Sequence, residues 1–315
     1  MQVADADYKL SGPYTHENLA VFLLHAPDRP GGRPYLTLQE ALEQKKAVVY
    51  ETEDVRELAI ENLSDEEIYI QSGDIVKGGK QDRVLAVDFI APAKSGKLPI
   101  SAFCVERGRW RGRGAESAAE FSSSTLQISS RGAKLATRAG SSQQQVWEQV
   151  AESQTKLSSA LGAEVVDEAS VTSLQLTLEH TKVQESIEAH VKALSGIADQ
   201  KPDVIGYAFA INGRFNSADA YSSHALFKKL WPKLLSASAT EAVSELQPDE
   251  KFEQPKTEDV LAAMQGAQQS GKTEQKEVQP RVRLLTQQAP QGAYFRTLDS
   301  GRAEALVHES WVSST

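Results

Sequence analysis

The stretch "SGDIVKGGKQDRVLAVDFI", Ser72–Ile90, decides the fold of the first part of the chain. Gly73 and Gly78 have the spacing of a phosphate-binding loop, but Lys80 comes one residue late and Gln81 follows it in place of the magnesium-binding hydroxyl. The segment "RVLAVDFI" alternates like a strand, so the helix N-terminus that would hold phosphate is missing. We therefore interpret the Gly-Gly dipeptide as a turn between two strands.

The same turn is dense in charge. Asp74, Lys77, Lys80, Asp82 and Arg83 lie within ten residues of one another. A hairpin needs only the glycines, so these side chains either form a solvated tip or belong to a ligand site. Both interpretations remain open from the sequence.

Strand-like segments surround this turn. The segments "NLAVFLL", "AVVYET", "ELAIEN", "EIYIQS" and "LPISAFCVE" are separated by Gly, Pro, Asn and Ser turns, and one short helix is predicted at Thr37–Lys46 with Thr37 as its cap. We predict that residues 1–113 form an antiparallel β-rich part, arranged as a sandwich or a barrel-like structure.

The rest of the chain has a different pattern. Residues 114–145 are rich in Ser, Ala and Gln without periodicity, so we expect an irregular connection. Residues 146–315 predict an α+β region with a polar excursion at 247–280 and a closing β-meander. The expected elements are a helix from about Val146 to Leu161 capped by Ser141 or Ser142, a helix at Thr181–Leu194 capped by Thr181, a buried strand "VIGYAFAI", an Asn212-Gly213 hairpin, a helix that Pro232 kinks or restarts, and a short helix at Asp259–Gln265.

The composition and net charge of the chain argue against some classes of function. The chain has 315 residues, 40% of them hydrophobic, and a net charge of −9, which argues against binding to duplex nucleic acid. One cysteine, Cys104, excludes an internal disulfide, and its apolar strand predicts a buried thiol rather than a nucleophile. The sequence shows no membrane span and no cofactor motif, and it identifies no protein partner or oligomeric state.

Two polar clusters are candidate sites. In "CVERGRWRGRG", Arg107, Arg109, Arg111 and Arg113 alternate, so on an extended chain they would share one side and suit phosphate or carboxylate, unless the segment is only a solubilising loop. Between a buried strand and a helix, polar residues either bind a ligand or serve turns and caps; they are Asn212, Asn216, Asp219 and Tyr221. The six histidines have no zinc-enzyme spacing, so no metal site is predicted.

A longer set of residues resembles a known family. The segment "IENLSDEEIYIQSGDIVKGGKQDRVLAVDFIAPAKSGKLPISAFCVERGRW" is similar to the signature of the ARG and rhodanese–phosphatase-superfamily-associated protein domain family. The matching positions are Asn62, Ser64, Gly73, Gly78-Gly79-x-Gln81-x-Arg83, Pro92-Ala93-x-Ser95, Pro99, Ile100 and Cys104-Val105-Glu106-x-Gly108-Arg109-Trp110. The segments "GPYTHENLAVFLL" and "AINGRFNSADAYSSHALFKKLWPKLL" extend the resemblance over most of the chain.

The resemblance implies little chemistry. Family members more often have a glutamate near the Gly-Gly turn, where this chain offers Asp74. The family name implies a role near NAD or ADP-ribose metabolism by association alone, with no catalytic residues to carry over. Longer members are often exported, so we expect a periplasmic or secreted protein if a signal peptide was removed ahead of Met1, and a cytoplasmic protein otherwise.

Three functions fit these observations. The first is a metal-free protein that binds an anionic, phosphate- or ADP-ribose-like compound through Lys80, Gln81, Arg83, Arg107, Arg109 and Trp110. The second is a hydrolase in which Glu106 or Asp74 is the acid–base residue. The third is an exported structural or partner-binding domain, which predicts that Gln81 and Arg83 are buried and bonded to the backbone.

Overall fold

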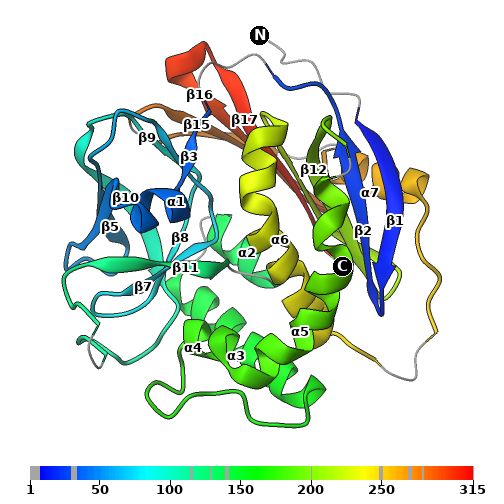
Figure 1. The fold of residues 1–315 in the computed structure, drawn as a ribbon, viewed down its shortest axis with the longest axis horizontal. Coiled ribbons are helices and arrows are strands. Elements are labelled where there is room, and N and C mark those ends of the chain that lie inside the picture. The colour runs from blue at the N-terminus through cyan, green and yellow to red at the C-terminus, as the bar shows by residue number, and fades with distance from the viewer. Residues whose placement is uncertain are drawn as a thin grey trace.

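The computed structural model describes residues 8–29, 34–113, 116–127, 130–138, 142–199, 201–247, 251–268, 272–278 and 280–314. Within these ranges the chain forms seventeen strands and seven α-helices, which confirms the expected α+β class (Figure 1). The polar start of the chain at residues 1–7 and the alternative cap Ser141 lie outside the described residues.

The largest sheet has eight antiparallel strands and contains the predicted meander. Its order is β1 (Lys9–His16), β2 (Leu19–His25), β12 (Val204–Ile211), β13 (Arg214–Tyr221), β17 (Ala305–Ser313), β16 (Gly292–Asp299), β15 (Val282–Ala289) and β14 (Lys272–Val278). β1 and β2 come from the part of the sequence grouped with the signature, yet β2 pairs with β12. The boundary expected near Arg113 is therefore not a boundary between sheets.

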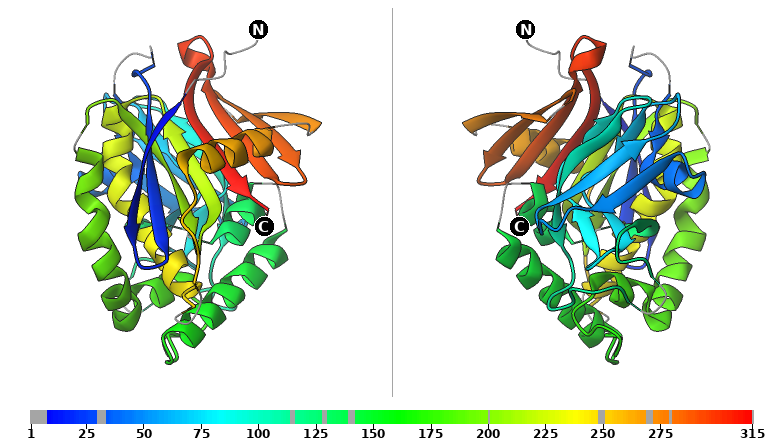
Figure 2. Two further views of the ribbon diagram at one scale, coloured as in Figure 1. Left: turned by 90° about the vertical axis from the view of Figure 1, so that its right-hand side faces the viewer. Right: turned by 90° about the vertical axis from the view of Figure 1, so that its left-hand side faces the viewer.

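The two faces of β12 bury side chains of different size, as the alternation of large and small residues in "VIGYAFAI" predicts. Tyr207 and Phe209 pack against α6 (His224–Ser244), while Ala208 and Ala210 belong to the core that includes α7 (Thr257–Gln268). Small side chains let α7 approach the sheet closely. α6 and α7 thus cover opposite faces of the large sheet (Figure 2).

The signature region forms two smaller sheets. The first has the order β11 (Phe121–Gln127), β7 (Asp74–Gly78), β8 (Arg83–Leu85), β10 (Gly96–Cys104), β5 (Glu57–Asn62) and β4 (Ala47–Glu51). The second has the order β3 (Leu36–Thr37), β6 (Ile68–Ile70) and β9 (Phe89–Ala91). A strand, β8, follows the Gly-Gly turn, so the rejection of a phosphate-binding loop is confirmed.

Several expected boundaries need correction. "RVLAVDFI" forms two strands in different sheets rather than one, because the chain crosses between the sheets at Ala86–Asp88. Residues 114–145, expected to be irregular, contain β11 and α2 (Arg131–Arg138). The polar excursion contains β14, and α6 does not restart at Pro232 but continues through it.

The remaining helices match their sequence signals more closely. α1 (Leu38–Glu43) has Thr37 in a capping box, and α3 (Gln143–Ala160) has Ser142 in another. α5 (Thr181–Leu194) begins where expected, but its cap is His180, which also ends α4 (Leu174–Glu179). Two 3₁₀ helices, Ser195–Asp199 and Ser300–Arg302, complete the described elements.

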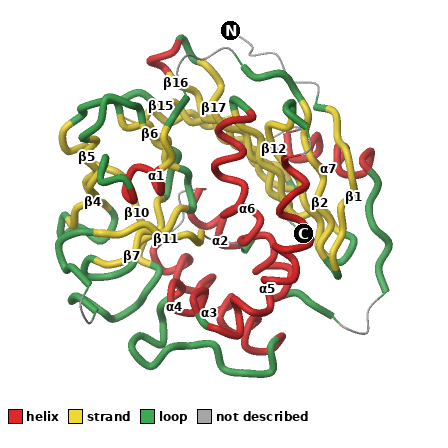
Figure 3. The backbone as a smooth tube through the Cα atoms, viewed as in Figure 1, coloured by secondary structure: helices red, strands yellow, loops and turns green. Residues whose placement is uncertain are grey.

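The helices are grouped rather than dispersed. Figure 3 separates the strand-rich part at the left, which carries α1, from helices α2–α6 near the centre and bottom of the view.

None of the helices in the described ranges combines the length and apolarity that a membrane crossing requires. The core is divided among clusters that line the large sheet, the signature sheets and the α2–α5 group.

Candidate functional site

The signature turn connects β7 to β8 with two glycines in the left-handed region. Gly78 has φ +119° and Gly79 has φ +56°, conformations that other residues adopt only with strain. A β-carbon on Gly79 would lie 2.2 Å from the ring of Phe121 on β11. The glycines are therefore required by both backbone conformation and packing.

Asp82 holds this turn from inside the protein. Its carboxylate accepts a hydrogen bond from the backbone N–H of Gly78 at 3.0 Å and another from Ser173, the cap of α4, at 3.1 Å. Arg113 donates to the same carboxylate at 3.0 Å. Asp82 has no exposed surface, and this burial raises its pKa although Arg113 acts in the opposite direction. Asp82 thus connects the turn, α4 and the segment Arg107–Arg113, called the arginine segment below.

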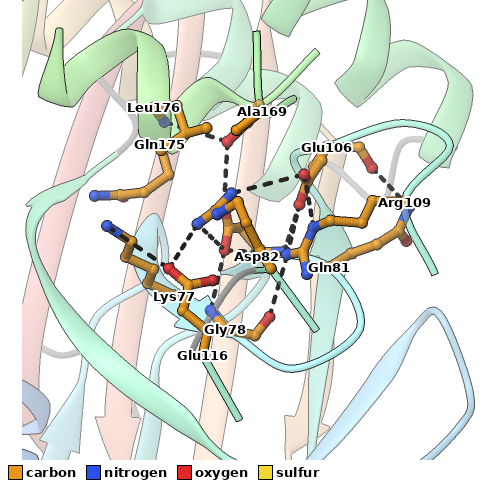
Figure 4. A network of polar contacts seen from close by, with 12 residues as sticks. Lys77, Gly78, Gln81, Asp82, Glu106, Arg109, Glu116, Ala169, Gln175 and Leu176 are labelled. Atoms are coloured by element: carbon orange, nitrogen blue, oxygen red, sulfur yellow. Dashed lines mark hydrogen bonds and ion pairs between the residues drawn. The ribbon is translucent and has the colours of Figure 1, made fainter. Parts of the chain in front are cut away.

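Glu106 is the second buried carboxylate of the network. Arg109 donates from Nε to Glu106 at 2.7 Å, and the backbone N–H of Asp82 donates at 3.2 Å. Burial acts to raise the pKa of Glu106, but the hydrogen bond and charge of Arg109 outweigh it, so the pKa lies below its ordinary value. Gln81 donates from Nε2 to the backbone carbonyl of Glu106 at 2.9 Å. Figure 4 shows these side chains converging in one network.

Arg83 lies inside the fold. Its side chain is fully buried, donates to the carbonyl of Gln81 at 3.0 Å and pairs with Glu51 at 3.4 Å. Gln81 and Arg83 are thus both buried and bonded to the backbone, which is the arrangement that a structural role predicts. Lys80 pairs with Glu53 at 2.8 Å and lies 5.2 Å from the centre of the Trp110 ring.

The other residues of the arginine segment are dispersed. Trp110 is 44% exposed and has the Lys80 and Arg83 charges near its ring. The guanidinium carbon of Arg107 lies 5.5 Å from the centre of the Trp147 ring, whereas Arg109 forms an ion pair with Glu106. The alternating arginines do not form one row, because the segment after β10 is not an extended strand.

Asp74, the other acid–base candidate, forms an ion pair in a different part of the structure. It is buried on β7, where Lys233 of α6 donates to it at 3.0 Å and the backbone N–H of Gln71 donates at 3.2 Å. Asp74 and Glu106 therefore hold different cations. Each carboxylate is positioned to neutralise an internal charge.

The four candidate residues of the β12–β13 hairpin lie at two different places, two residues at each. Asn212, with φ +50°, forms the β12–β13 turn and donates to the carbonyl of Glu245 at 2.8 Å. Asn212 and Asn216 line a polar pocket with Arg131 and Arg214. Asp219 and Tyr221, further along β13, are buried and contact His308 instead.

His308 is the centre of a buried cluster between the large sheet and the signature region. Its two ring nitrogens lie 2.7 Å from Asp88 and 3.1 Å from Asp219, and the Tyr221 ring stacks on it at 4.7 Å. Burial lowers the pKa of His308, but the two carboxylates outweigh that effect and the pKa is raised. Thr297 also donates to Asp88, at 2.5 Å. His308, bonded to two carboxylates that favour its protonated form, thus joins β13, β16 and β17 to the signature region.

A pocket opens beside this cluster. Its interior offers about 30 Å³ of space to water-sized groups, well below the volume of sites that enclose drug-sized ligands, so it fits at most one small group of a ligand. Its walls combine signature residues, α2 and the meander, namely Ser72, Ala86, Val87, Asp88, Arg138, Leu284, Leu285, Thr286, Phe295, Arg296, Thr297 and His308. The pocket therefore lies where the two parts of the chain meet.

One arginine side chain, that of Arg138, brings positive charge to the pocket. Arg138 lies over the Phe295 ring at 5.5 Å, donates to Ser310 and is 3.9 Å from Asp219. Arg296 also borders the pocket, but its guanidinium is 3.5 Å from Glu309 and lies near the Tyr294 ring, on the face of the sheet that α7 covers.

The sequence interpretation did not identify Asp88, Arg138, Arg296 and His308. The available signal was a charged residue within an apolar strand pattern, as for Asp88 in "RVLAVDFI" and His308 in "EALVHESW". The two lie 220 positions apart in sequence, so their contact depends on the fold.

Comparison with known proteins gives one match. The family profile described as ARG and Rhodanese-Phosphatase-superfamily-associated Protein domain matches residues 7–312. Neither the curated proteins nor the solved structures contain a match to this chain. The match covers the signature, the pocket walls and the meander together, so it confirms the resemblance seen in the sequence. The chain belongs to the ARG and Rhodanese-Phosphatase-superfamily-associated Protein domain family.

Proposed function

We propose that this protein binds a small anionic compound, phosphate- or ADP-ribose-like, with the anionic group in the pocket between α2, the meander and the signature region. The observation that carries the proposal is Arg138, whose guanidinium lies at the pocket wall over the Phe295 ring. Forked guanidiniums match the oxygens of phosphate and carboxylate.

The pocket is better suited to this role than the signature turn. At the turn, Arg83, Arg109 and Lys80 each have an internal carboxylate as partner. If any of these three residues bound a ligand instead, its partner carboxylate would lose that ion pair. Two of the partner carboxylates, those of Glu51 and Glu106, are buried. Phe295 and Leu284 give the pocket an apolar wall as well, which would contact the uncharged part of a larger ligand.

Binding fits the arrangement better than hydrolysis. Glu106 and Asp74 are held by Arg109 and Lys233, and both nitrogens of His308 face carboxylates. A general acid or base needs an atom within hydrogen-bond reach of its substrate. None of these three groups has an uncommitted atom directed into the pocket.

Calorimetry with inorganic phosphate, ADP-ribose and NAD tests the proposal. We expect saturable binding of at least one of these compounds, weakened about tenfold or more by Arg138→Gln, since a hydrogen bond to a charged group contributes about 1.5–3 kcal/mol. Arg283→Gln is the matched control, because Arg283 lies on neighbouring β15 and pairs with surface carboxylates.

The variants also distinguish the two candidate surfaces. Loss of binding in Arg109→Ala with full binding in Arg138→Gln would place the ligand at the signature turn and contradict the pocket. If none of the three compounds binds the unmodified protein, the proposal fails.

A further inference from the structure

Three metal-ligand side chains meet at the end of the first hairpin, on elements other than those that line the anion pocket. His16 ends β1, Glu17 lies in the turn to β2, and His190 projects from α5. The ring centres of His16 and His190 are 4.7 Å apart, and His190 Nε2 is 3.6 Å from a Glu17 carboxylate oxygen. One ligand atom from each residue lies within 4.8 Å of the others.

Among the described residues, the backbone of Ser186 is one further polar neighbour of His190, but most of the polar atoms of the two rings have no hydrogen-bond partner. His190 is 1% exposed, and neither of its ring nitrogens makes a hydrogen bond of good geometry with the described residues. The Nε2 atom of His16 is also buried without one. A buried polar atom without a partner costs about 1–3 kcal/mol, so two such side chains facing each other need a compensating interaction.

Glu17 occupies a position that does not suit it conformationally. Its φ is +48°, a left-handed conformation in which Gly, Asn or Asp is usual. The neighbouring Asn18 anchors the turn, donating to the carbonyl of Ala242 at 2.9 Å and accepting from the N–H of Asn212 at 3.0 Å. The turn is therefore fixed in place with a half-exposed carboxylate directed to His190.

We propose that His16, Glu17 and His190 bind a divalent transition-metal ion of the Zn²⁺ type. Two imidazoles and one carboxylate are a donor set that such ions favour, and three protein ligands leave one position for water or another ligand. The sequence could not predict this site, because His190 reaches the hairpin only through the packing of α5.

The cluster is open to solvent on one side. Glu17 is about half exposed, so an ion can enter from solvent without unfolding the hairpin.

Zn²⁺ titration of the metal-free protein, without a histidine tag, tests the proposal. We expect one Zn²⁺ bound per chain, measured by calorimetry and by metal analysis after gel filtration. Glu17→Gln and His16→Gln should each weaken Zn²⁺ binding about tenfold or more. Glu188→Gln is the matched control, because it removes an exposed carboxylate from α5, two residues before His190.

Thermal unfolding provides a second readout that does not depend on activity or on the anion pocket. Saturating Zn²⁺ should raise the Tm of the unmodified protein and of Glu188→Gln, because an ion that binds only the folded state stabilises it. It should leave the Tm of Glu17→Gln and His16→Gln nearly unchanged.

Two results would overturn the site. One is the absence of stoichiometric Zn²⁺ binding to the unmodified protein, and the other is full binding by both variants. The Arg138→Gln variant should bind Zn²⁺ normally, so failure of the anion pocket and failure of the metal site are separable.

Discussion

Gly79 shows how one residue can be required for two independent reasons. Gly79→Ala should destabilise the protein through the left-handed φ, about 1–2 kcal/mol, and through overlap with Phe121, about 1–3 kcal/mol more. Gly96→Ala separates these effects, because Gly96 has φ +63° but an added β-carbon there meets nothing within 4 Å. Urea unfolding of both variants checks this, and equal losses would exclude a packing role for Gly79.

The thiol of Cys104 is expected to be inert in the folded protein. Cys104 is fully buried at the end of β10, and burial raises its pKa to about 11, so little thiolate forms at neutral pH. A disulfide reagent should label it only after unfolding in denaturant. Labelling of the native protein at the rate of the unfolded chain would show that this strand end opens freely.

At the scale of elements, Asp82 ties a turn, a helix cap and the arginine segment together. Asp82→Asn should destabilise the protein by about 1.5–3 kcal/mol, because Arg113 loses its buried ion pair with Asp82 and keeps only Glu116 and the more distant Glu106. Glu116→Gln is the control, since Glu116 pairs with the same arginine but is partly exposed, and it should cost less than about 1 kcal/mol. Similar losses in urea unfolding would contradict a central role for Asp82.

Elements with strong local signals could be predicted from the sequence, and others could not. The capping boxes at Thr37 and Ser142 and the Asn212-Gly213 turn depend on neighbouring residues, so the sequence suffices. α2 has a polar sequence and is held by distant partners, with Lys134 donating to Ser217 and Arg138 to Ser310. Tertiary contacts of this kind override local propensity.

At the scale of the whole molecule, the candidate sites depend on contacts between distant segments. Asp74 reaches Lys233, Gln71 reaches Tyr221, and Asp88 reaches His308. The sequence predicted that the signature residues matter, but it could not show that their charges are paired internally while a pocket forms elsewhere. Burial and pairing of charge are properties of the assembled sheets, and no local pattern encodes them.

The cluster at His308 should make the stability of the whole molecule depend on pH. Because the folded-state pKa of His308 lies above its ordinary value of 6.5, the stabilisation by the imidazolium is fully present below pH 6.5 and is lost as the pH rises through the folded-state pKa. The free energy of unfolding, measured with urea from about pH 6 to about pH 9, should therefore fall. His308→Gln should be less stable throughout, since Asp88 and Asp219 lose their shared cation, but it should lack this slope. An unchanged slope in the variant would show that another group titrates, and a flat profile in the unmodified protein would show that the two sheets are not joined by a charged histidine.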